Sequence, residues 1–202
     1  MFNHSLGIKK SMTQKVDKAP RTHEDIKEAV RKGLIIVHTG NGKGKSTAAF
    51  GTALRAMGRG YKVAIVQFIK GKWKTGEVEF FKKFPGQCEI FSMGEGFTWI
   101  TQNFEHDVAT AQKAWDKCCE ILHDEQYQLV IFDEINYVMK YNFLDVKEVL
   151  TKLKNKPPLK HVILTGNGTP PELIELADLV TEMNCVKHPY QKGVKAQPGI
   201  DY

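Results

Sequence analysis

The distribution of apolar residues along the chain constrains its fold more than any other feature. From Leu34 onward, short apolar runs alternate with segments of helical periodicity. Because these runs are apolar throughout, rather than at every second position, they are typical of strands buried on both faces of a parallel sheet. The six predicted strands are 34–39, 63–69, 88–92, 129–133, 161–165 and 179–183.

The segments between these runs repeat their apolar residues every three or four positions, as helices do. The expected helices are 45–58, 77–83, 105–124, 145–154 and 171–177. Alternating strands and helices joined by right-handed crossovers form a doubly wound α/β sheet. We therefore predict an α/β fold, with a mostly parallel sheet of about six strands flanked by helices.

The length of the chain, 202 residues, suits one well-buried domain and is short for two. We expect a single domain over 34–202 and a basic leader over 1–33, with a short helix that begins at Thr22. No apolar run approaches the ~18 residues of a membrane helix, and the N-terminus lacks the apolar stretch of a signal peptide. Neither a membrane protein nor a secreted protein is expected.

The distribution of charge along the chain limits which binding partners are expected. The net charge is +6, but residues 1–33 hold eight Lys or Arg against four Asp or Glu, so the rest of the chain is nearly neutral. A basic leader attracts any polyanion, ATP included.

The four cysteines, which are Cys88, Cys118, Cys119 and Cys185, form no CxxC pair and have no zinc-like spacing. We interpret them as free thiols of a cytoplasmic protein.

A glycine-rich segment follows the first predicted strand and precedes the first predicted helix. It reads Gly40–Asn41–Gly42–Lys43–Gly44–Lys45–Ser46–Thr47. This order is the context of a phosphate-binding loop, in which glycines let backbone N–H groups turn toward phosphate oxygens. Lys45 supplies a cation for the phosphates, and the Ser46 hydroxyl is placed to bind Mg²⁺. Together with the dipole of the helix N-terminus, the segment predicts triphosphate binding.

One residue departs from the usual G-x-x-x-x-G-K-[ST] spacing of such loops. That spacing requires a glycine at position 39, where this chain has Thr39. The glycines therefore begin at Gly40, and Lys43 adds a second cation. We expect residues 39–47 to bind ATP, with Lys43 and Lys45 as the charged groups that act on its phosphates.

The predicted strand 129–133 is followed by two carboxylates, since it ends at Asp133 and Glu134 comes next. In a sheet of this class the strand end lies beside the phosphate loop, so a carboxylate there can bind Mg²⁺ directly or through water. The alternative is that Asp133 caps the helical pattern over 135–141. No further residue is recognisable as a base that activates water.

Two segments do not fit a generic ATPase. Residues 94–103 place Phe97 and Trp99 in a glycine-flanked loop after the third predicted strand. Loops at the carboxyl ends of parallel strands carry ligands, and the alternative is that both aromatic side chains fold back on the sheet. The C-terminal segment 193–202 combines aromatic, glycine and charged residues in a pattern unlike a degenerate chain end.

These segments together resemble the P-loop family of cob(I)alamin adenosyltransferases, also called corrinoid adenosyltransferases. The resemblance rests on the phosphate loop, Val66–Gly71 (VQFIKG), Gly96–Asn103 (GFTWITQN), Val130–Glu134 and Gly193–Tyr202. It implies a RecA-like P-loop fold, a homodimer, and transfer of the 5′-deoxyadenosyl group of ATP to Co(I) of a corrinoid. Triphosphate is the implied leaving group.

The resemblance also implies how the phosphate site acts. Co(I) is itself a strong nucleophile, so the reaction needs alignment and charge stabilisation rather than a base. Lys43, Lys45 and Mg²⁺ held by Ser46, Glu134 and Asp133 would stabilise the departing triphosphate.

The remaining implied roles concern the corrinoid and one departure from the family pattern. Phe97 and Trp99 would pack against the lower face of the corrin and displace its axial ligand, so that a reduced flavoprotein can produce Co(I). Family members often have arginine at the position of Asn167, and asparagine cannot supply that charge to the triphosphate.

Functions of other classes remain open from the residues alone. A phosphoryl-transfer enzyme would use the same loop and carboxylates but leaves the aromatic loop and the tail unexplained. A RecA-like, ATP-dependent nucleic-acid binder would use the basic leader, yet the nearly neutral body shows no basic stripe with interleaved aromatics. A role as cobalamin carrier is compatible with the adenosyltransferase fold. We expect neither a nucleic-acid nor a membrane partner.

Overall fold

The computed structural model describes residues 30–69, 75–94 and 103–202. The chain divides into two compact units, Met1–Arg31 and Lys32–Tyr202, and all elements given below belong to the second. The helix expected from Thr22 lies outside the described residues, as do Phe97 and Trp99.

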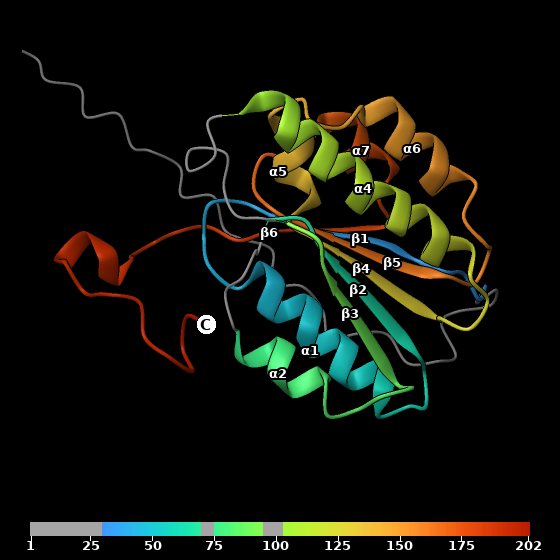
Figure 1. The fold of residues 1–202 in the computed structure, drawn as a ribbon, viewed down its shortest axis with the longest axis horizontal. Helices are drawn as coiled ribbons and strands as arrows, with labels where there is room; N and C mark the ends of the chain where they lie inside the picture. The colour runs from blue at the N-terminus through green and yellow to red at the C-terminus, as the bar shows by residue number, and fades with distance from the viewer. Residues whose placement is uncertain (1–29, 70–74, 95–102) are drawn as a thin grey trace, which may run out of the picture. The chain divides into compact units, whose positions relative to one another are not determined.

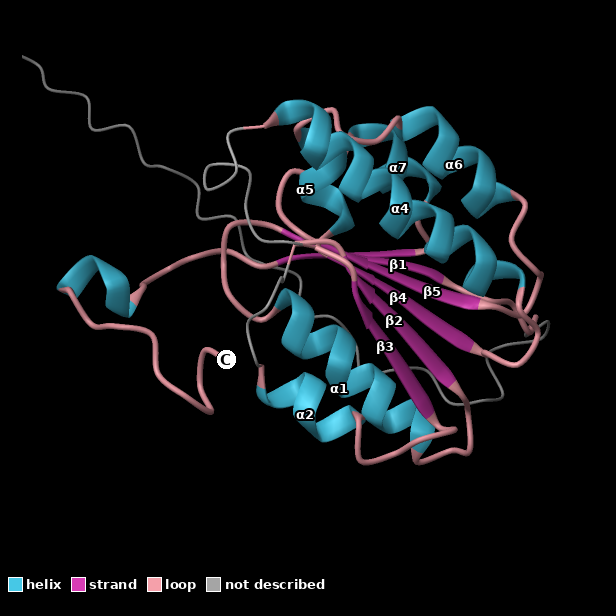
Figure 2. Cartoon of the chain, in the orientation of Figure 1, coloured by secondary structure: helices cyan, strands magenta, loops and turns pink. Residues whose placement is uncertain are grey.

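A parallel sheet of six strands forms the centre of the described unit (Figure 2). Its strand order is β3-β2-β4-β5-β1-β6, and every neighbouring pair runs parallel. The bounds are β1 (Ile35–Thr39), β2 (Val63–Gln67), β3 (Cys88–Ser92), β4 (Leu129–Asp133), β5 (His161–Thr165) and β6 (Leu179–Glu182). Because β5 lies between β1 and β4, the strand before the phosphate loop and the strand that ends in carboxylates are separated by one strand.

Helices cover both faces of this sheet (Figure 1). One face carries α1 (Lys45–Met57) and α2 (Gly76–Phe81). The other carries α4 (Phe104–His123), α5 (Ile135–Lys140), α6 (Val146–Lys154) and α7 (Pro171–Leu176). The doubly wound α/β sheet and the RecA-like P-loop fold are therefore confirmed. After β6 the chain leaves the sheet and forms a single 3-10 turn, η2 (Pro189–Lys192).

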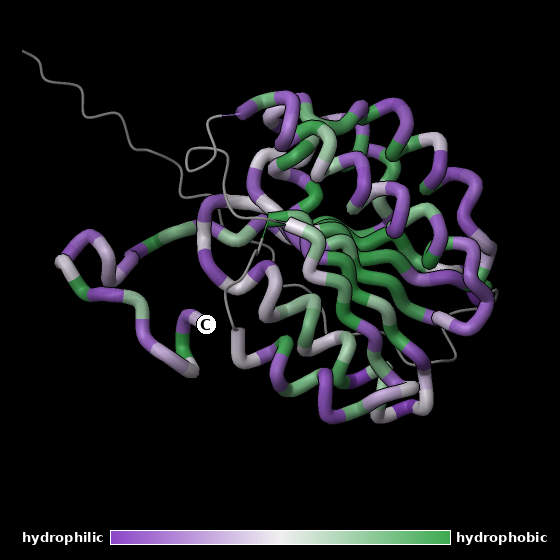
Figure 3. Tube along the Cα trace, viewed as in Figure 1, coloured by the Kyte–Doolittle hydropathy of each residue, from purple (hydrophilic) through white to green (hydrophobic). Residues whose placement is uncertain are grey.

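Alternate residues of the central strands face two separate hydrophobic cores, because successive side chains of a strand point to opposite faces. Phe132 and Leu164 face the α4–α7 layer, where they join the fully buried Trp115. Ile65 and Ile131 face α1 and α2. Figure 3 shows hydrophobic colour along the central strands and alternating hydrophobic and hydrophilic colour along the helices.

The prediction that all six strands are buried on both faces is wrong at the edges. Every residue of β6 is exposed, with Leu179 at 46% and Val180 at 38%, and β3 buries only Cys88. An edge strand has a neighbour on one side only, so its apolar residues are less protected than those of the four central strands.

Strand β2 is shorter than predicted. It ends at Gln67, two residues before the predicted end, although Phe68 and Ile69 are still buried. Among the helices of the described ranges, none combines the length and apolar character needed to cross a bilayer.

Candidate functional site

The phosphate loop joins β1 to α1, and two glycines determine its shape. Gly40 (φ +94°) and Gly44 (φ +106°) adopt left-handed backbone that other residues rarely adopt. Gly44 is the N-cap of α1, and its carbonyl accepts the first helical hydrogen bond, from the Ala48 N–H (2.8 Å). The chain thus turns sharply from strand into helix, and the unpaired N–H groups of the first turn of α1 lie at the loop.

Thr39, the departure from the usual spacing, belongs to the sheet. It is the last residue of β1 and only 8% exposed, and its carbonyl accepts a hydrogen bond from the Met183 N–H (2.9 Å). The left-handed position that opens the loop is Gly40. The contribution of Thr39 to nucleotide binding stays a prediction.

The segment after β6 supports the loop from one side. The Gly42 N–H donates to the Met183 carbonyl (2.6 Å), and the Cys185 N–H donates to Asn41 Oδ1 (2.9 Å). A Cβ at residue 42 would lie only 2.7 Å from that same Met183 carbonyl oxygen. Glycine is therefore required here by the close approach of two backbone segments, and the side-chain oxygen of Asn41 holds the loop against that segment.

Lys45, the first residue of α1, folds back over the loop. Its Nζ donates to the carbonyls of Gly40 (2.9 Å) and Gly42 (2.6 Å). Burial lowers the pKa of Lys45, and the negative charge of Glu134 acts in the opposite direction. The Glu134 carboxylate is therefore near enough to influence this ammonium. Since an ammonium binds an anion more strongly than a neutral carbonyl, Lys45 is ready to exchange these carbonyls for phosphate oxygens.

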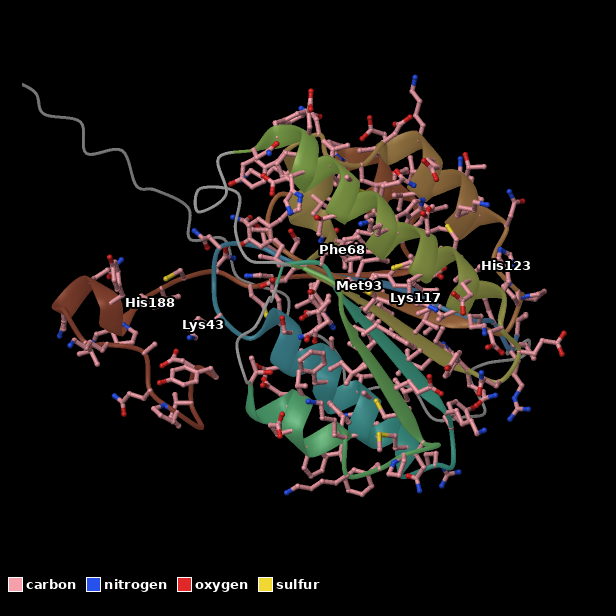
Figure 4. The ribbon with its side chains drawn as sticks, in the orientation of Figure 1. Lys43, Phe68, Met93, Lys117, His123 and His188 are labelled. Atoms are coloured by element: carbon pink, nitrogen blue, oxygen red, sulfur yellow. The ribbon has the colours of Figure 1, made fainter. Side chains whose placement is uncertain are left out.

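The next two predicted residues complete the first turn of α1. Ser46 is half-buried, and Thr47 is exposed. Lys43, the second predicted cation, lies between the loop and the C-terminal segment (Figure 4). It forms an ion pair with Asp201.

Asp133 and Glu134 occupy distinct places at the end of β4. Asp133 is fully buried; its Oδ1 accepts from the Thr165 hydroxyl (2.8 Å) and its Oδ2 from Gln67 Nε2 (3.2 Å). Glu134 has left-handed backbone (φ +68°) and stands at the N-cap of α5, where no side chain forms a cap hydrogen bond. Asp133 is thus the last residue of a strand, and the alternative that it caps the helix after 134 is wrong.

Polar residues from all six strands lie in a row across the carboxyl end of the sheet. The register pairs Gln67 with both Ser92 and Asp133, and it pairs His38 with both Thr165 and Thr181; the Thr165–Asp133 hydrogen bond joins the two halves. From β3 to β6 the row is Ser92, Gln67, Asp133, Thr165, His38 and Thr181. All of them except Thr181 come two positions after a strand residue that packs on the α1 side of the sheet. Sequence analysis missed this row, because only the register shows that these strand ends are neighbours.

The residues present fit a magnesium ion carried by a nucleotide. Mg²⁺ prefers oxygen ligands and in nucleotide sites binds one or two carboxylates together with substrate phosphates. The site offers the Ser46 hydroxyl and the carboxylates of Asp133 and Glu134. Asp133 accepts hydrogen bonds on both oxygens, as an ionised carboxylate does. The assignment of these three residues to the metal stays a prediction.

The predicted corrinoid residues Phe97 and Trp99 lie outside the described residues, but both ends of their loop are described. The Gly94 N–H donates to the Gln67 carbonyl (3.2 Å), so the loop, which follows β3, starts beside the carboxyl end of β2. It ends at Asn103, whose side chain caps α4 by accepting from the His106 N–H (3.1 Å). Both ends therefore lie at the edge of the sheet that carries the phosphate loop.

Asn167 lies at the same edge, in the turn after β5. It is flanked by Gly166 (φ +127°) and Gly168 (φ +78°), and the Asn136 amide donates to the Gly166 carbonyl (3.0 Å). Its half-buried side chain is neutral, so this turn brings no cation of its own from position 167.

A parallel sheet, a glycine-rich loop between β1 and α1, and carboxylates after β4 define a P-loop nucleotide-binding protein. Comparison with known proteins identifies the family. The family described as ATP:corrinoid adenosyltransferase BtuR/CobO/CobP matches residues 31–202. The chain belongs to this family.

Relatives named corrinoid adenosyltransferase are similar along most of their length. The protein of Sinorhizobium sp is 51% identical over 173 residues, which are 85% of this chain and 81% of that protein. The protein of Pseudomonas aeruginosa is 47% identical over 171 residues, covering 85% and 84% of the two chains. The protein of Escherichia coli K12 is 48% identical over 171 residues, covering 85% and 86%.

Proposed function

We propose that this chain transfers the 5′-deoxyadenosyl group of ATP to Co(I) of a corrinoid and releases triphosphate, in cobalamin biosynthesis and salvage. The corrinoid is cobalamin or a precursor such as cobyrinic acid a,c-diamide. The observation that carries the proposal is the family match over residues 31–202, which includes the phosphate loop, the end of β4 and the tail.

The reaction is an in-line displacement at the ribose 5′ carbon. Co(I) donates an electron pair to form the cobalt–carbon bond, and the bond between C5′ and the α-phosphate oxygen breaks, with its electron pair leaving on triphosphate. No proton is transferred in this step, so the protein has to align the two substrates and stabilise the charge on the leaving group.

Residues of the phosphate loop serve that second task. The Lys45 ammonium exchanges the Gly40 and Gly42 carbonyls for phosphate oxygens, and the loop N–H groups add neutral donors. Lys43 joins them when it leaves Asp201. Mg²⁺, bound through Ser46, Glu134 and Asp133, would neutralise further charge on the triphosphate.

The corrinoid binds next to the loop that begins at Gly94. In this proposal Phe97 and Trp99 pack against the lower face of the corrin and keep axial ligands from cobalt, so that a reduced flavoprotein can supply Co(I). The start of that loop at the Gln67 carbonyl supports a location beside the nucleotide.

The proposed assembly is a homodimer of domains 34–202, each preceded by the basic leader 1–33. Exposed apolar side chains on β6 and α7, among them Leu179 (46%) and Ile174 (44%), support a protein interface there. The four free cysteines support a reducing, cytoplasmic compartment.

The decisive experiment is anaerobic. The protein is mixed with ATP, Mg²⁺ and chemically reduced cob(I)alamin, the corrinoid absorbance is followed, and the product is tested for photolability. We expect a light-sensitive adenosyl–cobalt product with one triphosphate released per adenosyl group. Release of ADP and phosphate without corrinoid would instead indicate phosphoryl transfer or an ATPase.

A further inference from the structure

Gln67 belongs to the VQFIKG segment, for which the proposed function provides no role. It occupies the last position of β2, is 1% exposed, and lies opposite Asp133 in the register. Its side chain forms hydrogen bonds to the strands on both sides. Nε2 donates to Asp133 Oδ2 (3.2 Å), and Oε1 accepts from the Ser92 hydroxyl (2.9 Å).

The bond to Asp133 determines which way the Gln67 amide faces. An amide has a donor end and an acceptor end, and a carboxylate can only accept, so the NH₂ group must face Asp133. The Ser92 hydroxyl donates to the opposite end and holds the amide in place between the two strands. Gln67 therefore presents a donor to one oxygen of the carboxylate.

The other oxygen of Asp133 accepts a hydrogen bond whose donor is equally well determined. The Thr165 hydroxyl accepts from the Glu134 N–H (2.8 Å), and its own proton goes to Asp133 Oδ1 (2.8 Å). The two neighbouring strands, β2 and β5, thus hold one buried carboxylate by directional bonds, and the backbone of Glu134 orients the hydroxyl of Thr165. The strand residues two positions earlier, Ile65 and Ile131, are apolar, so the polar groups are confined to the edge beside the phosphate loop.

We infer that Gln67 and Ser92 are positioning residues, which hold the Asp133 carboxylate in the orientation that binding of magnesium–ATP requires. The inference rests on the proposed function, in which Asp133 serves the metal. Carboxylates that bind metals are themselves commonly oriented by hydrogen bonds from neighbouring groups. A buried polar network whose members are all hydrogen-bonded is rigid and fixes one arrangement of its side chains, which favours a role in orientation.

The test compares ATP binding with and without Mg²⁺ in the Gln67→Met variant, by calorimetry and without corrinoid. Methionine is similar in size and flexibility to glutamine but cannot donate to Asp133. We expect the gain in ATP affinity brought by Mg²⁺ to fall by about 10- to 100-fold, the usual cost of losing such an orienting partner. ATP affinity measured in EDTA should be unchanged.

A matched control is available on α4. Gln112 Nε2 donates to Asp116 Oδ1 (3.1 Å) on the exposed surface, a bond of the same kind as that between Gln67 and Asp133. Gln112→Met should leave both affinities at wild-type values.

A second variant covers the case in which Gln67→Met fails to fold. Ser92→Ala keeps Gln67 and removes only the hydroxyl that holds the far end of its side chain, so we expect a loss of about two- to ten-fold in the magnesium-dependent gain. The electron paramagnetic resonance spectrum of Mn²⁺ added with ATP should change in the same variants, because it reports the metal's ligands directly.

Three outcomes overturn the inference. Unchanged magnesium dependence in both variants shows that Asp133 needs no orienting partner. Equal losses of affinity with Mg²⁺ and in EDTA indicate a merely structural role. If wild-type ATP binding is itself independent of Mg²⁺, the proposed metal role of Asp133 fails as well. The proposed adenosyl transfer can fail separately, since the binding assay contains no corrinoid.

Discussion

Lys43 in the phosphate loop forms an ion pair with Asp201, which lies 158 positions later and next to the last residue of the chain. Asp201 also accepts from the Gln197 N–H (2.8 Å), which closes a turn in the tail. The Lys43 hydrogen bond is the main cause of the lowered pKa of this carboxyl, and the Gln197 bond adds to it. The second cation of the loop is therefore paired with the tail.

Asp201→Asn should strengthen ATP binding, because Lys43 would no longer have to leave a carboxylate in order to reach the phosphates. The pair is partly exposed, so the expected gain is about two- to five-fold in Kd, measured by calorimetry at low salt. Glu79→Gln, which removes the exposed pair with Lys82, serves as control. Weaker ATP binding in Asp201→Asn would show that the tail contact assists the nucleotide.

Lys45→Ala should lose ATP binding and turnover together. The ammonium is held by two loop carbonyls and would form charge-assisted hydrogen bonds to phosphate, so we expect at least about a 10-fold rise in the Kd of ATP. Lys113→Ala, on the exposed face of α4, is the matched control. An unchanged ATP affinity would contradict the assignment of the phosphate loop.

Trp99→Ala should slow the reaction that starts from Co(II) and a flavoprotein reductant far more than the reaction that starts from chemically reduced Co(I). The proposed role of Trp99 is to remove axial ligands before reduction, and pre-reduced cobalt bypasses that step. We expect a difference of about 10-fold or more between the two rate losses, measured by corrinoid absorbance. Phe80→Ala, an exposed aromatic on α2, provides the control. Equal losses in both assays would exclude the axial role.

The stability of the fold should depend on pH through His161 at the start of β5. Burial, assisted by the charge of Lys156, lowers the pKa of His161 below its ordinary value of 6.5, and its Nδ1 accepts from the Leu34 N–H (3.1 Å). Below about pH 6.5 the unfolded chain therefore binds the proton more readily than the folded chain. The free energy of unfolding should consequently decrease as the pH falls below that value.

His161→Asn keeps a hydrogen-bond acceptor and removes the titration. Between about pH 7 and about pH 5, Tm of this variant should fall by about 1–2 °C less than that of the wild type, as measured by calorimetry. His123→Gln, on the exposed end of α4, should retain the wild-type dependence. Identical slopes for His161→Asn and the wild type would assign the titration to another group.

The sequence predicted the bounds of three strands. The apolar runs of β3, β4 and β5 begin and end with their strands. At β2 they do not coincide, because the apolar run continues through Phe68 and Ile69, which stay buried although the strand ends at Gln67. At β6 the run is apolar and paired, yet exposed. Hydrophobic patterning predicts a tendency toward burial and not hydrogen bonding, so it marks neither where a strand ends nor which strand lies at an edge.

Part of the candidate site could be predicted from the sequence, and part could not. The loop glycines and Lys45 could be predicted because the strand, loop and helix that define them are contiguous. The bonds of Gln67 to Asp133 and of Lys43 to Asp201 could not, since they depend on strand register and on a tail far away in the sequence. Residues that are close in the sequence could therefore be predicted to share a site, whereas their hydrogen-bond and ion-pair partners on distant segments could be identified only in the structure.

The close contact between Gly42 and Met183 restricts how this protein can vary. Backbone atoms of two segments about 140 positions apart leave no room for any side chain at residue 42. A library randomised at this codon should return glycine alone among active clones. An insertion or deletion directly after β6 should likewise be selected against, although it lies far from the loop in the gene. The phosphate loop and the segment after β6 are thus expected to be constrained together during evolution, although they are far apart in the sequence.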